Sequence, residues 1–438
     1  MEDEAKNPAP ERERPAPLYS GYVLGLLGLT YAFSMMDRQI VTILLGDLKA
    51  EFALSDTQLG LLSGTAFALF YSTLAIPIAR LADRHNRITI ISISMTLWSI
   101  ATAVCAFVGN FWQLFLGRMA VGIGEAGGLS PAHSVLSDYF DERRRMLAIS
   151  LFSLCGTFGV MLGTAMGGYV SQEYGWRTAF LVAGLPGIAV ALLLKLTVRE
   201  PRRGAMDSTT AAAAEAPSEK EPFAQAVLGL MRNRLYLQVL IAHTLVIFVA
   251  YALVSWLPEL MLRTYEVSKA EVGVVIGLTF FVGGGGGMLI GGLLAMYFSK
   301  HDARWQLRIP ALGLLAALPL FWLAFNAETI HGASVLFAGA MMLGTLQHGP
   351  SLAVVQNCVP PHRRATAAAF NFFSSNLFGL GLGPLAVGSL SDLGASTYGG
   401  SSLAVALGAC VLLNIPALII FLRASNDLGK AAKAEQGS

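Results

Sequence analysis

The sequence LFLGRMAVGIGEAGGLSP at residues 114–131 decides the fold of this chain. It is an apolar, glycine-rich run whose only charged residues are Arg118 and Glu125. A spacing of seven residues brings both side chains to nearly the same face of an α-helix, because a helix has 3.6 residues per turn. An ionisable side chain at bilayer depth costs about 2.5 kcal/mol or more, so it normally faces a bundle interior or a wet cavity. The pair therefore indicates an ion or substrate path, with a structural ion pair that locks two helices as the alternative.

The rest of the chain is equally apolar. Of its 438 residues, 54% are hydrophobic and 13% are charged, whereas a soluble domain carries about 25% charged residues. Repeated apolar stretches between short polar loops can only be membrane-spanning helices, because hydrocarbon cannot satisfy exposed backbone groups. The sequence therefore predicts an all-α polytopic membrane protein.

Twelve transmembrane helices are predicted, in two pseudo-symmetric bundles of six. The predicted spans are 19–46, 57–82, 88–109, 111–138, 145–171, 177–198, 234–263, 270–298, 307–326, 331–358, 364–391 and 401–423. The corresponding divisions are a disordered tail at 1–18, bundles at 19–199 and 234–424, a linker at 200–233 and a tail at 425–438.

The basic residues predict the orientation in the membrane. Most of the 30 lysine and arginine residues fall in the two tails, the linker and the loops predicted on the same side. Short cytoplasmic loops carry such an excess of positive charge. Both tails are therefore predicted to be cytoplasmic, with the chain integral to the inner (plasma) membrane.

An internal repeat supports the division into halves. A shift of 220 residues superimposes the glycines at 159, 163 and 168 on those at 379, 383 and 388, and the arginines at 143 and 144 on those at 363 and 364. The preserved order favours two homologous halves that enclose a central cavity.

Two acids and two bases lie well inside the predicted spans. Asp37 and Arg38 lie midway along the first, and Arg118 and Glu125 lie in the fourth. Burial favours the protonated form of a carboxyl group and a nearby arginine opposes it, so an acid whose partner moves away can take up a proton. Asp37 and Glu125 are the predicted proton-coupling acids. Arg38 and Arg118 are predicted to form the substrate headgroup site or an ion-pair network.

The second half is predicted to form the substrate wall, because the repeat partners of Arg118 and Glu125 there are Ala338 and Thr345. An amphiphile needs an apolar groove for its tail and a few polar groups for its head. The candidate cavity residues are His243, Tyr251, Trp256, Gln347, His348, Phe370, Asn371 and Asn376. Ordinary helix packing is the alternative for each of them.

The loop after the second span reads ARLADRHNR at residues 79–87. It resembles the signature G-x-L-A-D-R-x-G-R-R/K of the major facilitator superfamily, with Ala79 and Asn86 in place of the two glycines. The run RMAVGIG at 118–124 also resembles that superfamily's R-x-x-x-G-x-G pattern. The resemblance implies alternating access and a cytoplasmic gating loop at Asp83, Arg84 and Arg87. The alternatives are that Asp83 caps a helix and that both arginines only follow the positive-inside rule.

Three stretches are similar to the spinster family within that superfamily. They are YAFSMMDRQIVTILLGDLKAEF at 31–52, GRMAVGIGEAGG at 117–128 and WLPELM at 256–261. The resemblance implies proton-linked export of amphiphilic lipids such as sphingosine-1-phosphate or lysophospholipids. The alternatives are a major facilitator carrier for another small molecule or drug, by efflux or uniport, and an intramembrane lipid-modifying enzyme.

Other functional classes lack their sequence signals. The chain has no G-x-x-x-x-G-K-[ST] loop, no H-E-x-x-H motif and no paired cysteine spacing, so no primary pump, cofactor, metal site or disulfide is predicted. A formal charge of +2 is too small to imply a nucleic-acid partner. We expect a monomeric, non-enzymatic carrier whose partners are an amphiphilic lipid substrate, protons and membrane lipids.

Overall fold

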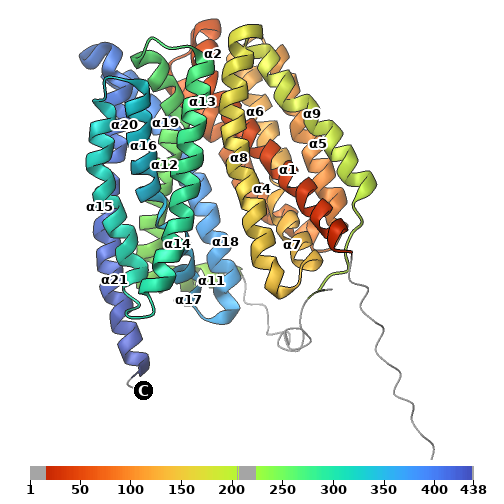
Figure 1. Cartoon of the computed structure of the whole chain (residues 1–438), viewed down its shortest axis with the longest axis vertical. Helices are drawn as coiled ribbons and strands as arrows, with labels where there is room; N and C mark the ends of the chain where they lie inside the picture. The colour runs from red at the N-terminus through yellow and green to blue at the C-terminus, as the bar shows by residue number, and fades with distance from the viewer. Residues whose placement is uncertain (1–15, 205, 207–222, 437–438) are drawn as a thin grey trace, which may run out of the picture.

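The computed structural model describes residues 16–204, 206 and 223–436. Within these ranges the regular structure is helical throughout. Figure 1 shows two groups of helices side by side, the first half (16–204) in red to yellow and the second half (223–436) in green to blue. Both described chain ends lie at the bottom of this view, which we call the terminal end, and we call the other end the opposite end.

The helices of the first half are α1 (Pro17–Ile43), α2 (Leu45–Phe52), α3 (Asp56–Gly60), η1 (Leu61–Thr65), α4 (Ala66–Ala82), α5 (Arg87–Val104), η2 (Cys105–Phe107), α6 (Phe111–Glu125), α7 (Leu129–Tyr139), α8 (Glu142–Tyr174) and α9 (Trp176–Thr197). Polar side chains begin several of them at the membrane surface by accepting a hydrogen bond from a free backbone N–H. Examples are Ser55 before α3, Asn86 before α5 and Asn110 before α6.

The helices of the second half are α11 (Phe223–Arg232), α12 (Arg234–Thr264), α13 (Lys269–Phe280), η3 (Phe281–Gly285), α14 (Gly286–Phe298), α15 (Trp305–Phe325), α16 (Ile330–Thr345), α17 (His348–Asn357), η4 (Pro361–Arg363), α18 (Arg364–Ser374), η5 (Ser375–Gly381), α19 (Leu382–Tyr398), η6 (Gly399–Ser401), α20 (Ser402–Val411) and α21 (Asn414–Gln436). Asn233 and Ser268 cap the starts of α12 and α13 in the same way.

Ten helical stretches of the described residues are long and apolar enough to cross a membrane. The predicted span at 111–138 is not one of these because it is interrupted between α6 and α7. The stretch 364–430 contains two predicted spans, which the turn at 399–401 separates. The architecture is therefore consistent with twelve spans, and the protein has the predicted all-α polytopic fold.

The structure differs from the predicted linker and tail in two places. The linker predicted at 200–233 contains α11, whose Ala226 and Leu230 are buried. The tail predicted at 425–438 continues α21 as far as Gln436. Residues 1–15 of the first predicted tail and residues 207–222 of the linker lie outside the described residues.

The glycines of the sequence repeat make equivalent contacts in the two halves. Each lies where an added Cβ atom would collide with the backbone or side chain of a neighbouring helix. The equivalent pairs are Gly159 with Gly379 and Gly163 with Gly383, which contact α1 and α12, and Gly168 with Gly388, which contact the starts of α13 and α3. The helices contacted are themselves related by the repeat, so the structure reproduces the pseudo-symmetry of the sequence.

Helices are interrupted at repeat-related positions. α6 ends at Glu125 and α16 ends at Thr345, its repeat partner, and each helix resumes after two or three residues as α7 or α17. The π-helical segments η1 and η5 contact each other across the two halves, and η3 contacts α8. π-helical turns are rare and are frequent at functional sites.

Candidate functional site

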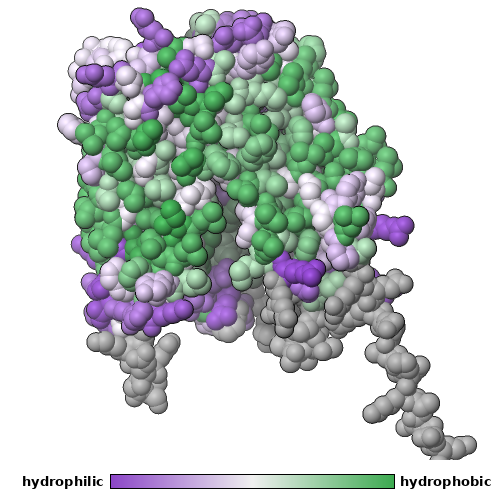
Figure 2. Space-filling model, viewed as in Figure 1, coloured by the Kyte–Doolittle hydropathy of each residue, from purple (hydrophilic) through white to green (hydrophobic). Residues whose placement is uncertain are grey.

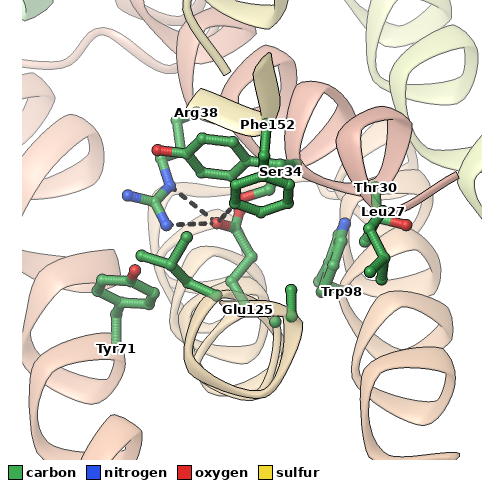
Figure 3. A pocket seen from close by; sticks show the side chains of 12 residues that line it. Leu27, Thr30, Ser34, Arg38, Tyr71, Trp98, Glu125 and Phe152 are labelled. Carbon is green, nitrogen blue, oxygen red and sulfur yellow. Dashed lines mark hydrogen bonds and ion pairs between the residues drawn. The ribbon is translucent and has the colours of Figure 1, made fainter. Parts of the chain in front are cut away.

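The closest ion pair in the middle of the first half joins Arg38 of α1 to Glu125 at the end of α6 (Figure 3). Nε and Nη2 of Arg38 lie 2.8 and 2.7 Å from Oε2 of Glu125. The Ser34 hydroxyl donates to the same oxygen at 2.6 Å. The Glu125 side chain is 0% exposed and that of Arg38 is 10% exposed. All three contacts therefore fall on one oxygen of a buried carboxylate.

The second ion pair is looser. Nη1 of Arg118 lies 3.9 Å from Oδ2 of Asp37, and both residues are buried. The Thr102 hydroxyl of α5 lies 2.8 Å from each oxygen of Asp37. Each arginine is thus paired with the acid of the other helix, and the four groups together carry no net charge.

Aromatic rings of α4 cover both arginines. The guanidinium carbon of Arg38 lies 4.6 Å from the ring centre of Phe67 and 4.4 Å from that of Tyr71. That of Arg118 lies 5.6 Å from Phe67. Such cation–π contacts stabilise a guanidinium away from water. Tyr251 of α12 packs against the same aromatic cluster, so this wall reaches the second half.

Two glycines of α6 let this helix, which carries Glu125, pack closely against α4 and α5. Gly122 and Gly124 lie against the backbones of Phe67 and Trp98, where an added Cβ atom would collide. Close packing is therefore the role that the structure gives to these glycines. The helix stops directly after Glu125, at the pair Gly127 and Gly128.

Three of the predicted cavity residues come together in the second half. Nδ1 of His243 and Oε1 of Gln347 are 2.7 Å apart, and both residues are buried. The ring of His348 lies 5.7 Å from that of His243. Gln347 and His348 follow the interruption of α16, the repeat equivalent of the break after Glu125.

The remaining cavity predictions fall mostly in packing positions. Trp256 is fully buried and donates from Nε1 to the carbonyl of Pro384 at 2.8 Å, so it joins α12 to α19. Phe370 packs on the hydrophobic core of the second half. Asn376 donates to the carbonyl of Phe372 within its own helix, and Asn371 is buried. The structure does not place these four side chains in one group with His243.

The predicted gating residues lie at the terminal end. Arg84 is exposed, and the backbone carbonyl of Asp83 accepts a hydrogen bond from Arg203. Arg87 is buried and donates to Asp138 at 2.5 Å and to Glu200 at 2.6 Å. The loop is therefore fastened within the first half.

The sequence does not identify these partners, because Glu200 and Arg203 lie within the predicted linker at 200–233. Nη2 of Arg203 also bonds the carbonyls of Ala82 and His85, at 2.7 and 2.9 Å. The available signal is that both follow the end of the span at Val198 within five residues, where charged side chains can reach the loop at 83–87.

A second missed group joins the two halves at the opposite end. Asp56, which begins α3, receives two hydrogen bonds of 2.9 Å from Arg263 of α12. Lys49 and Ser391 also bond its carboxylate, at 2.6 and 2.7 Å. Arg263 further contacts Glu259 at 2.7 Å. We call the contact between Asp56 and Arg263 the opposite-end seal.

Further polar contacts reinforce this end. Asp392 of α19 accepts hydrogen bonds from the backbone N–H groups of Asp56 and Thr57, at 3.0 and 2.7 Å. Lys269 pairs with Asp47 across the halves. Nearer the middle, the Thr65 hydroxyl of η1 donates to the carbonyl of Gly381 in η5 at 2.7 Å. The two halves are therefore closed together from the opposite end to the level of the π-helical segments.

The surface between the halves is hollowed at the terminal end. Figure 2 shows this recess in the lower part of the view, between the two groups of apolar helices. Apolar side chains, in green, cover the flanks of the molecule, and polar ones gather at both ends. This is the surface of a protein that is surrounded by lipid and accessible to water at its two ends.

Comparisons with known proteins agree with this geometry. The model of the Major Facilitator Superfamily matches residues 27–384. An MFS-type efflux pump of Mycolicibacterium smegmatis is 32% identical over 93% of this chain and 91% of its own length. The Sphingosine-1-phosphate transporter SPNS2 of Danio rerio is 28% identical over 93% and 85% of the two chains.

A solved structure is also similar over almost the whole chain. It is a bacterial homologue of the human lysosomal transporter Spinster in an inward-facing and unoccupied conformation, 29% identical with a TM-score of 0.82. The match covers 94% of this chain and 98% of that one. The chain therefore belongs to the major facilitator superfamily, as a transporter and not an enzyme, and is related to the spinster proteins.

Proposed function

We propose that this protein is a monomeric secondary active transporter that moves an amphiphilic lipid by alternating access and couples the movement to protons. The observation that carries the proposal is the buried, neutral set of two acids and two arginines beside a boundary that is closed at one end and hollowed at the other. Buried ionisable groups in a membrane protein mark ion or substrate paths.

The terminal end is the cytoplasmic end in this proposal. The positive-inside rule places the basic loops of that end in the cytoplasm. The recess then opens to the cytoplasm, and the opposite-end seal closes the path to the outside. The inward-facing conformation of the similar solved structure supports the same assignment.

Exchange of partners by Arg38 links the lipid to the proton. An anionic headgroup that binds the guanidinium draws it away from Glu125, which leaves a buried carboxylate without its counter-charge. Such a carboxylate gains by taking up a proton. Lipid and proton binding are then coupled through one side chain, and the coupling is reciprocal.

A phosphate-bearing lysolipid or sphingosine-1-phosphate is the substrate class that fits these groups. A guanidinium forms paired, charge-assisted hydrogen bonds with a phosphate, which a lysine cannot match. The name of the Danio rerio relative, a sphingosine-1-phosphate transporter, supports this class. Apolar surface between the halves would hold the acyl tail.

Arg38→Lys and Arg118→Lys test the headgroup assignment. Each variant is expected to weaken binding of sphingosine-1-phosphate about tenfold, since a paired charge-assisted hydrogen bond is worth at least 1.4 kcal/mol more than a single one. Binding of sphingosine, which has the same chain and no phosphate, is expected to change little. Affinities are measured in detergent at one fixed pH. Equal losses for both ligands would mean that the arginines shape the cavity without contacting the headgroup.

The loop at Asp83 is proposed to latch the cytoplasmic end when the transporter opens outward. Loss of one ionic contact of about 1 kcal/mol shifts a two-state equilibrium severalfold. Asp83→Asn is therefore expected to enlarge the population that is open at the terminal end. Distances between spin labels at His85 and His362, one in each half, report that population. Identical distance distributions for the variant and the parent protein contradict a latch.

Drug efflux is the second candidate function. The relative from Mycolicibacterium smegmatis is described as an efflux pump, and it is more similar in sequence than the sphingosine-1-phosphate transporter. Identification by mass spectrometry of a lipid that co-purifies with the protein would favour lipid transport. Transport of cationic dyes with no phospholipid competition would favour efflux.

A further inference from the structure

A small cavity lies beside Glu125 within the first half (Figure 3). All of its lining residues belong to the first half, including Thr30, Ser34, Trp98 and Gly128. On α1 it extends from the level of Arg38 to that of Leu27, towards the terminal end. No residue of the second half lines it, in contrast to the recess that separates the two halves.

The cavity has the size and the polar groups of a water site. Its volume is about 10 Å³, which is small and leaves room for about one water molecule. The hydroxyls of Thr30, Tyr31 and Ser34 line it together with Glu125. A buried water requires two to four polar partners, and these four groups can supply them.

The two oxygens of Glu125 have different surroundings. Oε2 receives all three hydrogen bonds from Arg38 and Ser34. Oε1 is buried, and no hydrogen-bond partner for it occurs among the described residues. A buried acceptor without a partner is unfavourable, so a water donor beside Oε1 would stabilise the carboxylate.

We propose that one water molecule occupies this cavity, donates a hydrogen bond to Oε1 of Glu125, and delivers the proton that this carboxylate takes up. The inference rests on the proposed proton coupling. A proton that reaches the water forms hydronium, which passes it to Oε1 and leaves a neutral water and a neutral carboxylic acid. The charge on Glu125 is then lost, and Arg38 is released from its ion pair.

The proton and the lipid thus act on different oxygens of Glu125, although Arg38 and Tyr71 also line the water cavity. Arg38 and Oε2 lie towards the aromatic wall of Phe67, Tyr71 and Tyr251, which extends to the second half. Oε1 would receive its hydrogen bond and its proton from the water in the cavity of the first half. The charged and titratable groups around Glu125 are Tyr31, Asp37 and Arg38 of α1, Tyr71 of α4, Arg118 of α6 and Tyr251 of α12.

Gly128→Ala is the variant that fills the cavity. A Cβ atom there would lie 3.4 Å from the carbonyl oxygen of Glu125 and 3.6 Å from the ring of Trp98, which are ordinary contacts. The backbone φ of −87° suits alanine. Because Gly128 lines the cavity, the added methyl group is expected to reduce the space for the water without replacing a polar side chain. Gly25→Ala is the matched control, because a Cβ atom at Gly25 has no neighbour within 4 Å.

The water itself is tested by experimental maps at a resolution that shows ordered solvent. A peak within hydrogen-bond distance of Oε1 is expected in the parent protein and in Gly25→Ala. The peak is expected to be lost in Gly128→Ala. A parent map without this peak, or a peak that persists in Gly128→Ala, overturns the water site.

The proton route is tested in proteoliposomes with radiolabelled sphingosine-1-phosphate. In Gly128→Ala, uptake driven by a pH gradient is expected to fall to the level of Glu125→Gln, while exchange of the lipid at equal pH continues. Gradient-driven uptake equal to that of Gly25→Ala overturns the route. A parent protein that exchanges the lipid but ignores the gradient refutes the proposed coupling and the route together, and the maps still decide the water site.

Discussion

Glu125→Gln and Asp37→Asn are each expected to abolish accumulation of the lipid against its gradient and to leave the protein folded. The amides have nearly the shape of the acids but cannot exchange a proton. The Gln oxygen can still accept hydrogen bonds from Arg38 and Ser34, which now reach Oε2 of Glu125. The aromatic contact between Arg38 and Tyr71 also remains. These remaining contacts of Arg38 should keep the variant folded, because a buried charge left without any partner costs about 3–5 kcal/mol.

The measurement is uptake into proteoliposomes under an imposed pH gradient, compared with lipid exchange at equal pH. Loss of gradient-driven uptake with retention of lipid exchange at equal pH identifies a defect in proton coupling. Glu51→Gln serves as the control, because Glu51 pairs with Arg177 in an exposed position at the opposite end. Gradient-driven accumulation at the parent level in both Glu125→Gln and Asp37→Asn would exclude carboxylate coupling.

Asp56→Asn and Arg263→Ala are expected to open the opposite end. The Asp56 side chain is 4% exposed and joins the halves through its two bonds to Arg263. Removing one partner of a buried pair costs about 3–5 kcal/mol, and the 24% exposure of Arg263 lets water recover part of this. A net loss of even about 1.4 kcal/mol shifts the equilibrium about tenfold towards the state in which this end is open.

Spin labels at Glu173 and Glu266, exposed residues of the two halves at this end, measure the change. A longer distance component is expected to grow in both variants. Arg177→Ala is the matched control, since it removes an ion pair at the same end within the first half alone. An unchanged distance distribution in Asp56→Asn would falsify the assignment of the seal.

The fold and the central charges were predictable because each rests on a strong local signal. A charged residue in an apolar run is costly in a membrane, so Arg118 and Glu125 had to face the interior and find partners. Arg38 and Asp37 were the opposite charges at the same depth. The structure pairs them across α1 and α6, as their positions require.

The opposite-end seal was not predictable because its parts carry no such signal. Asp56 and Arg263 lie more than 200 residues apart and at helix ends, where charged residues are common. The surroundings of Trp256 were not predictable either. The sequence predicts Trp256 as a candidate cavity residue, with helix packing as the alternative, and its indole N–H donates to the carbonyl of Pro384 in the core. The contact of Asp56 with Arg263 and that of Trp256 with Pro384 both form only when whole helices pack together.

The π-helical segment η5 determines which side of α19 faces the first half. A π turn holds one residue more than an α turn, so it takes up an extra residue that in a regular α-helix would rotate everything beyond it by about 100°. Asp392 lies beyond η5, and its carboxylate meets the start of α3. A single-residue deletion within 375–381 would therefore convert the π turn to an α turn and keep Asp392 on the side of α3, whereas a deletion within 382–391 would turn Asp392 away from α3. Closure of the opposite end therefore depends on an unchanged number of residues between η5 and Asp392 as well as on the identity of residue 392.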